Sequence, residues 1–163
     1  MRLIPITENN LSDIIMIQKA AFQKLYKKYQ DHQTSPYTQT LAGLQEKYRL
    51  PNNYFFLIAT TETIGFIRVV TYDSQTRARI APIAILPDKE NQGYGSHVLQ
   101  LIETTFPTVM AWQLSTILQE EKLIHFYQKA GYHQQKDTQE IQENMTITFF
   151  TKNIFPKKKQ CNQ

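Results

Sequence analysis

The sequence lacks long hydrophobic runs and contains a single cysteine. Its longest apolar run covers residues 54–59, far short of the ~20 consecutive apolar residues that a membrane-spanning helix requires. The first residues, Met1 to Pro5, lack the extended apolar segment of a secretory signal. The single cysteine, Cys161, cannot form an internal disulfide and agrees with a reducing compartment. We therefore expect a cytoplasmic protein without a membrane partner.

Several signatures of catalytic and binding sites are also missing. The four histidines, His32, His97, His125 and His133, show no metal-ligand spacing, and Cys161 adds none. The sequence has neither the Gly-x-Ser-x-Gly of serine hydrolases nor the Gly-x-x-x-x-Gly-Lys-Ser/Thr of a Walker loop. We therefore expect no metal cofactor and no covalent nucleophile.

What remains is the composition of one globular domain. The chain has 163 residues, of which 41% are hydrophobic and 20% charged, and a length of this order fits one domain with a real core. We place that domain at residues 1–155. Part of the net charge of +4 comes from Lys157, Lys158 and Lys159, in a basic tail at 156–163 that we expect to be mobile. A basic tail can bind nucleic acid, but no recognised motif accompanies it, so we expect no nucleic-acid partner.

The spacing of hydrophobic residues changes along the chain and predicts a mixed α/β domain. Aromatic and β-branched runs predict strands at residues 2–6, 54–60, 63–72, 77–86, 111–118 and 145–152, with a possible short strand at 132–135. Helical spacing appears at about 14–25, 40–50, 95–106 and 120–130. Gly65, inside the third predicted strand, marks either a bulge or a close backbone approach.

Residues 80–96 carry the clearest chemical signal. The stretch runs from a strand through a polar loop and Gly93-Tyr94-Gly95 into a helix. Backbone entering a helix presents free N–H groups to an anion, and glycines without Cβ let it approach closely. A dinucleotide fingerprint would need Gly or Ala where Val98 stands. The stretch therefore predicts a phosphate or pyrophosphate site of another kind, although Gly-x-Gly also occurs in ordinary loops.

Two motifs in this sequence resemble those of the GCN5-related N-acetyltransferase (GNAT) family. Residues 80–96 resemble the family's motif A, and residues 120–132 resemble motif B, with Phe126-Tyr127 near the helix end and Gly131-Tyr132 after it. The elements between residues 4 and 151 match the family's order. The resemblance implies an α/β (α+β) fold with a mixed, mostly antiparallel central sheet of six to seven strands, flanked by about four helices. It also implies transfer of an acetyl group from acetyl-CoA to a primary amine.

The resemblance further implies roles for individual residues. The pantetheine arm of acetyl-CoA would pair with the strand edge at Ile83 and Ile85, and the N–H of Ile85 or Leu86 would polarise the thioester carbonyl. Tyr127 would be the acid that protonates the departing thiolate, or else a packed aromatic residue. No base is identified, because residues 79–86 contain no carboxylate; a water relay or an acceptor that arrives neutral is equally open. The remaining residues expected to bind the cofactor are Asn91, Gln92, Gly93, Tyr94, Gly95, Ser96 and Phe126.

The chain departs from the family pattern at two positions, and the acetyl acceptor is not specified. Glu90 stands where the family usually has Gln or Arg, and Glu120 stands where it often has Asn; both bear on cofactor affinity. Tyr29, Asp31 and Tyr37 predict recognition of a cationic amine, or else an ordinary loop packed by tyrosines. We expect an N-acetyltransferase that acts as a monomer or homodimer on a small amine or a protein amine. The alternative is a non-catalytic acetyl-CoA-binding sensor.

Overall fold

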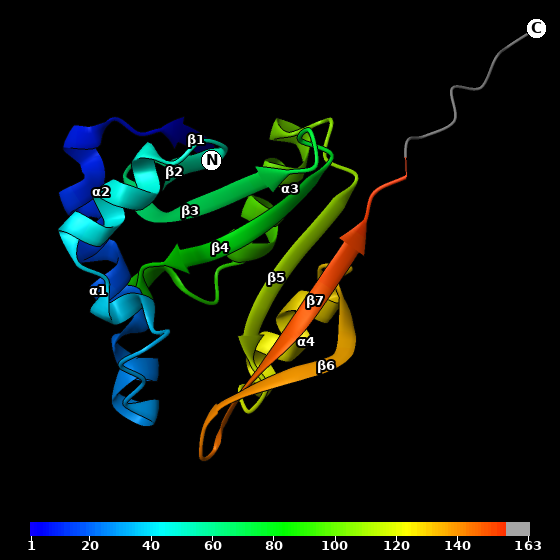
Figure 1. Ribbon diagram of the computed structural model, residues 1–163. Coiled ribbons are helices and arrows are strands. Elements are labelled where there is room, and N and C mark those ends of the chain that lie inside the picture. Colours follow the sequence, from blue (N-terminus) through cyan, green and yellow to red (C-terminus); the bar gives the residue numbers. More distant parts are fainter. Residues whose placement is uncertain (156–163) are drawn as a thin grey trace, which may run out of the picture.

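The computed structural model describes residues 1–155, which form one seven-stranded sheet with four α-helices (Figure 1). The predicted basic tail, 156–163, and Cys161 lie outside the described residues. The helices are α1 (Leu11–Tyr29), α2 (Leu41–Arg49), α3 (Tyr94–Thr105) and α4 (Glu121–Lys129). The strands are β1 (Arg2–Pro5), β2 (Asn53–Ala59), β3 (Thr63–Tyr72), β4 (Arg77–Ile85), β5 (Ala111–Ile117), β6 (His133–Gln142) and β7 (Met145–Asn153). None of the helices in residues 1–155 has the length and apolar character needed to cross a bilayer.

The strand order is β1-β2-β3-β4-β5-β7-β6, and only the pair β4–β5 is parallel. The other pairs are antiparallel. A parallel pair needs a crossover connection, and α3 supplies it between β4 and β5. This architecture confirms the predicted mixed, mostly antiparallel sheet of six to seven strands with about four helices.

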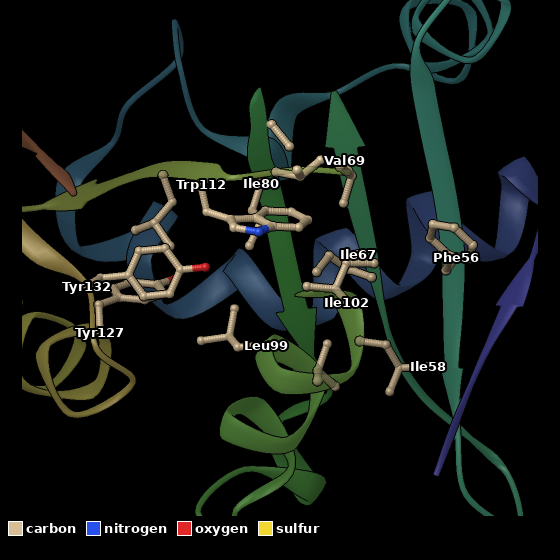
Figure 2. Packing of buried hydrophobic residues seen from close by; sticks show 14 of the residues in the cluster. Phe56, Ile58, Ile67, Val69, Ile80, Leu99, Ile102, Trp112, Tyr127 and Tyr132 are labelled. Atoms are coloured by element: carbon tan, nitrogen blue, oxygen red, sulfur yellow. The ribbon is translucent and has the colours of Figure 1, made fainter. Parts of the chain in front are cut away.

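Helices cover both faces of the sheet, because its central strands carry apolar side chains on both sides. On β3, Phe66 packs into a cluster with residues of α1 and α2, whereas Ile67 packs into the larger cluster on the opposite face. That larger cluster includes Leu99 and Ile102 of α3 and Trp112 of β5, as Figure 2 shows. The alternation of side chains along a strand therefore separates an α1/α2 face from an α3/α4 face.

Strands β4 and β5 pair over only three residues and then diverge (Figure 1). The last pair is Arg79 with Gln113. Immediately after it, the register between β3 and β4 shifts, so that two residues of β4, Ala81 and Pro82, form a bulge. Proline has no N–H for a ladder, and a bulge bends the strand that carries it. The bulge therefore lies where β4 turns away from β5 and opens the sheet.

Most predicted strands and helices lie within two residues of the observed ones, but α1 and β6 do not. Helix α1 extends beyond the predicted 14–25 at both ends, to Leu11–Tyr29. A short strand was predicted at 132–135, whereas β6 spans His133–Gln142 and pairs with β7 at the sheet edge. Nine of its ten residues are exposed, so no apolar alternation marks it in the sequence. Gly65 meets both of its predicted roles: the β2–β3 register shifts beside it, and a Cβ there would lie 2.1 Å from the carbonyl oxygen of Ala84.

Candidate active site

The divergence of β4 and β5 opens into a cleft of about 1370 Å³. Its walls come from α1, α2, both diverging strands, the loop before α3, and α4. Two of the residues predicted to bind the cofactor, Leu86 and Gln92, do not line the cleft. Those that do are Ile83, Ile85, Asn91, Gly93, Tyr94, Gly95, Ser96 and Phe126.

The edge of β4 facing the cleft has free backbone groups. The N–H of Leu86 donates to Ile64 of β3 over 2.8 Å. In an antiparallel pair alternate residues bond to the partner, so the N–H of Ile85, opposite Gly65, points away from β3. The β4–β5 pairing ends at Arg79, which leaves this edge without a neighbouring strand. Of the two predicted carbonyl-polarising donors, the free one is therefore the N–H of Ile85.

The loop before α3 forms a row of unpaired N–H groups. Within residues 1–155, the backbone N–H groups from Asn91 to Ser96 have no hydrogen-bond acceptor; the first helical bond runs from His97 to Gly93. Gly93 has φ 80°, a conformation that costs a residue with a Cβ about 1–2 kcal/mol. Unpaired N–H groups at the positive end of a helix dipole are suited to bind phosphate oxygens. The loop therefore has the geometry that a pyrophosphate would need.

Gly95 has a different role from Gly93. A Cβ on Gly95 would lie 2.9 Å from Cζ of Phe126 on α4, whereas a Cβ on Gly93 would meet nothing within 4 Å. Gly95 therefore lets α3 pack against α4, which closes the cleft at that end. The sequence had assigned both glycines to the approach of an anion, and the structure adds this packing contact.

Charged side chains near the loop are largely paired. Nζ of Lys89 lies 2.5 Å from Glu62 and 3.5 Å from Asp88, and the hydrogen bond to Glu62 raises the pKa of Lys89. Glu90 is exposed at the rim of the cleft. Anion binding at this loop would therefore depend mainly on backbone N–H groups.

Tyr127 lies near the C-terminal end of α4 and lines the cleft, although only 8% of its surface is exposed. Its ring contacts the rings of Phe126, Tyr132 and Phe150, with centroids 4.9 to 6.2 Å apart. Figure 2 shows Tyr127 beside Tyr132. Burial raises the pKa of Tyr127 to about 12. The hydroxyl therefore stays protonated at neutral pH, as a proton donor must.

The residues predicted to recognise the acetyl acceptor do not come together. Tyr29 and Asp31 line the cleft, but Tyr37 stacks on Tyr26 with ring centroids 4.4 Å apart and does not line it. Asp31 is only 2% exposed and accepts hydrogen bonds from the backbone N–H groups of Gln33 and Thr34. Burial opposes its ionisation, but hydrogen bonds within the loop outweigh burial and lower the pKa of Asp31. This carboxylate holds its own loop in shape.

Glu120 links the start of α4 to the end of α1. Its Oε1 accepts hydrogen bonds from Nζ of Lys28 and the hydroxyl of Tyr29, each 2.5 Å long. Burial alone would raise the pKa of Glu120, but these hydrogen bonds outweigh it and lower the pKa. The position marked in the sequence as a departure from the family therefore makes a contact across the cleft.

With this geometry established, comparison with known proteins gives the family. Residues 19–132 match the acetyltransferase (GNAT) family. The chain belongs to that family. The GNAT assignment identifies the protein as an acetyltransferase enzyme and accounts for the order of the two motifs. No curated protein matches this acetyltransferase.

Solved structures of other acetyltransferases share the fold at low sequence identity. An acetyltransferase from Thermus thermophilus has a TM-score of 0.74 and 17% identity, covering 94% of this chain and 96% of its own. A protein described as a phosphinothricin N-acetyltransferase has a TM-score of 0.75 and 10% identity, covering 95% and 99%. A mutant of spermidine N-acetyltransferase from Vibrio cholerae has a TM-score of 0.71 and 14% identity, covering 94% and 95%. At these identities the likeness shows the GNAT fold alone.

The basic residues that line the cleft of this GNAT protein and that sequence reasoning missed include Lys47 of α2, Arg68 of β3 and Arg79 of β4. One signal was available, since Arg68 interrupts the apolar run of β3. Across residues 1–155, no group of three or more His, Cys, Asp or Glu side chains could hold a metal ion.

Proposed function

We propose that this GNAT enzyme moves an acetyl group from acetyl-CoA to a primary amine by direct attack. The observation that carries the proposal is a pair of sites with free backbone groups on the same wall of the cleft. One is the unpaired edge of β4 at Ile83 and Ile85, and the other is the row of N–H groups from Asn91 to Ser96. A pantetheine arm needs an extended strand edge, and a pyrophosphate needs clustered N–H groups. The cleft presents both in the order in which acetyl-CoA carries these two parts.

The residues of the cleft then have separate roles in the transfer. The amine nitrogen attacks the thioester carbonyl, so a C–N bond forms while the C–S bond breaks. The N–H of Ile85 donates to the carbonyl oxygen as negative charge develops on it. The hydroxyl of Tyr127, with its pKa raised to about 12 by burial, gives its proton to the departing thiolate. Because β4 offers no carboxylate from Arg79 to Ile85, an acceptor that arrives as an ammonium first loses a proton to water in the cleft, whereas a neutral acceptor needs no such step. The attacking nitrogen then loses one further proton to water as the amide forms, and water returns a proton to Tyr127, so that the products are a neutral amide and a free thiol.

The fold alone does not select the acceptor. The solved structures of similar fold carry names as different as spermidine N-acetyltransferase and phosphinothricin N-acetyltransferase. Tyr29 lines the cleft at the end of α1, where its hydroxyl donates to Glu120, and this position on α1 supports a role in binding the acceptor. Recognition by Asp31 and Tyr37 stays a prediction, as does the monomeric or homodimeric state.

The test begins with thermal unfolding in the presence of acetyl-CoA. At ~100 times the dissociation constant, a ligand specific for the folded state adds ~2.7 kcal/mol, which is about 5–10 °C for a domain of this size. Acetyl-pantetheine, which lacks the pyrophosphate, is the control ligand and should stabilise much less. Release of free thiol in the presence of a panel of amines then measures the transfer itself.

Each outcome decides a different part of the proposal. Stabilisation by acetyl-CoA together with amine-dependent thiol release supports the full reaction. Stabilisation without thiol release from any amine would instead favour a sensor that binds acetyl-CoA. The absence of a shift at millimolar acetyl-CoA would contradict the assignment of the loop and the β4 edge to this cosubstrate.

A further inference from the structure

Three basic side chains gather on the α1/α2 face of the cleft. Lys47 comes from α2, Arg68 from β3 and Arg79 from β4, and all three line the cleft. Arg68 and Arg79 lie on adjacent strands and point to the same face, opposite to Val69 and Ile80 of the larger core cluster. The pKa of Lys47 is lowered by burial and by the positive charges of Arg68 and Arg79. The three charges therefore repel one another.

The cluster lacks acidic partners. In residues 1–155, none of its three members forms a salt bridge. Lys47 donates to the side-chain oxygen of Gln39, and Arg68 donates to that of Asn53. Both partners are neutral amides, so they leave the positive charge of the cluster uncompensated.

The acids of the same cleft are used elsewhere. The carboxylate of Asp31 holds its own loop, and that of Glu120 binds Lys28 and Tyr29. Glu90 is exposed at the loop before α3, and Glu121 is exposed in the first turn of α4. Lys47 and Arg68 are half-buried, and Arg79 is exposed to the solvent of the cleft. Cations that gather without acids create a positive potential that attracts an anion, and a ligand can supply that anion.

The cluster also lies close to the reacting edge of the sheet. Nη1 of Arg68 donates to the carbonyl of Ala81 over 3.2 Å, and Ala81 is two residues before Ile83 in β4. A strand rises about 3.3 Å per residue, so Ala81 lies roughly 13 Å at most from Ile85. An anionic group of a small molecule at the cluster could therefore belong to the same molecule as an amine near Ile85.

We propose that Lys47, Arg68 and Arg79 bind a carboxylate of the acetyl acceptor, which is then a small amino acid carrying its reacting amine and this carboxylate together. This inference rests on the proposed acetyl transfer to an amine and narrows its acceptor class. The guanidinium group presents paired N–H donors that suit a carboxylate. The amine would lie toward Ile85 and Tyr127.

The test compares amines that differ only in the carboxylate. Thiol release is measured with leucine against leucinamide and with 4-aminobutyrate against butylamine, alongside spermidine. Variants Lys47→Gln and Arg79→Gln remove one charge each; Arg68 is left intact because it also holds Asn53 and the β4 backbone. Arg77→Gln is the matched control, since Arg77 is exposed on the same strand, pairs with Asp73 and does not line the cleft.

We expect the wild type to prefer one carboxylate-bearing amine over its neutral counterpart by at least about tenfold in kcat/KM, as charged hydrogen bonds allow. Lys47→Gln and Arg79→Gln should each raise KM for that amino acid about tenfold and leave KM for the neutral amine unchanged. Arg77→Gln should change neither KM. Preference for butylamine, leucinamide or spermidine would overturn the inference and leave acetyl transfer intact. No thiol release with any amine, despite stabilisation by acetyl-CoA, would overturn the proposed function and this inference with it.

Discussion

The half of the cleft that we propose to bind acetyl-CoA, at the end of β4 and the start of α3 (the cofactor half), differs from the half that we propose to bind the acceptor in the atoms that face a ligand. This acceptor half comprises α1, α2, β3, the first residues of β4 and the start of α4. The cofactor half presents backbone N–H groups, from Ile85 and from Asn91 to Ser96. The acceptor half presents charged side chains, among them Lys47, Arg79 and Glu120. Backbone groups are common to all residue types except proline, so the first half tolerates side-chain changes that leave the backbone in place. The second half can change its ligand with a single substitution.

The largest expected effect comes from removing one backbone donor. Ile85→Pro deletes the free N–H facing the cleft, and proline is tolerated where no ladder bond is lost. We expect kcat to fall by about 10²–10³-fold, the usual cost of one oxyanion donor, while the melting temperature changes little. Steady-state thiol release and thermal unfolding measure the two quantities.

The control lies at the next residue. Leu86 has φ −60°, which suits proline, but its N–H donates to Ile64. Leu86→Pro should therefore lower the stability by about 1 kcal/mol with a smaller effect on kcat. An unchanged kcat in Ile85→Pro would contradict the assignment of the backbone donor.

Tyr127→Phe probes the one side chain proposed to act between the two halves. Loss of the acid should lower kcat about 100-fold, within the range for general acid catalysis. Because the pKa of Tyr127 is raised to about 12, its deprotonation should not limit kcat between about pH 6 and 10.

Tyr132→Phe is the matched control. Tyr132 is buried beside Tyr127, its hydroxyl donates to Glu103 over 3.3 Å, and it does not line the cleft. This variant should cost about 1 kcal/mol of stability and leave kcat unchanged; equal kcat values in both variants would exclude the acid role.

Gly95→Ala separates two explanations for a glycine in the cofactor half. The added Cβ would lie 2.9 Å from Phe126, and overpacking of this kind costs about 1–3 kcal/mol. We expect acetyl-CoA affinity, measured by calorimetry, to fall about tenfold. If packing is the cause, Phe126→Leu in the same chain restores most of the affinity. If Phe126→Leu fails to restore the affinity, the close approach of an anion is the better explanation for glycine at position 95. In Gly93→Ala the added Cβ meets no protein atom within 4 Å, so this variant measures the energetic cost of the positive φ at that position.

The sequence predicted the strand, loop and helix of the cofactor half because their signals are local. Proline, glycine and a change from strand to helix spacing occur within residues 80–96, and the structure has the loop and α3 there. The same reasoning predicted the boundaries of β3 and the close approach at Gly65. It could not choose between Ile85 and Leu86, because that choice depends on the register with β3.

The acceptor half could not be predicted in this way, because its residues come from distant parts of the chain. Lys47, Arg68 and Arg79 are brought together only when α2 packs on the sheet and β4 pairs with β3. Asp31 looked available in the sequence, but its side chain bonds its own loop. Only the start of β6 was predicted, at 132–135, for a related reason: an exposed edge strand needs no apolar alternation, and its pairing with β7 is visible only in the fold.

The smallest expected effect tests whether Glu120 ties the start of α4 to the end of α1 within the acceptor half. Lys28 and Tyr29 both donate hydrogen bonds to the carboxylate of Glu120, and Glu120→Gln replaces this carboxylate with a neutral amide. A partly exposed ion pair of this kind contributes about 1 kcal/mol or less to stability. The pKa of Glu120 is lowered in the folded state, so its contribution is present above the unfolded pKa of ~4.3 and is lost as the pH falls through the folded pKa. The stability difference between wild type and variant should therefore be full near neutral pH and vanish in acid. Glu121→Gln is the control for charge at the helix start, because Glu121 lies in the same turn but is exposed. If the stability difference between wild type and Glu120→Gln persists in acid, or if Glu121→Gln reproduces it, the contact between α1 and α4 makes no specific contribution to stability.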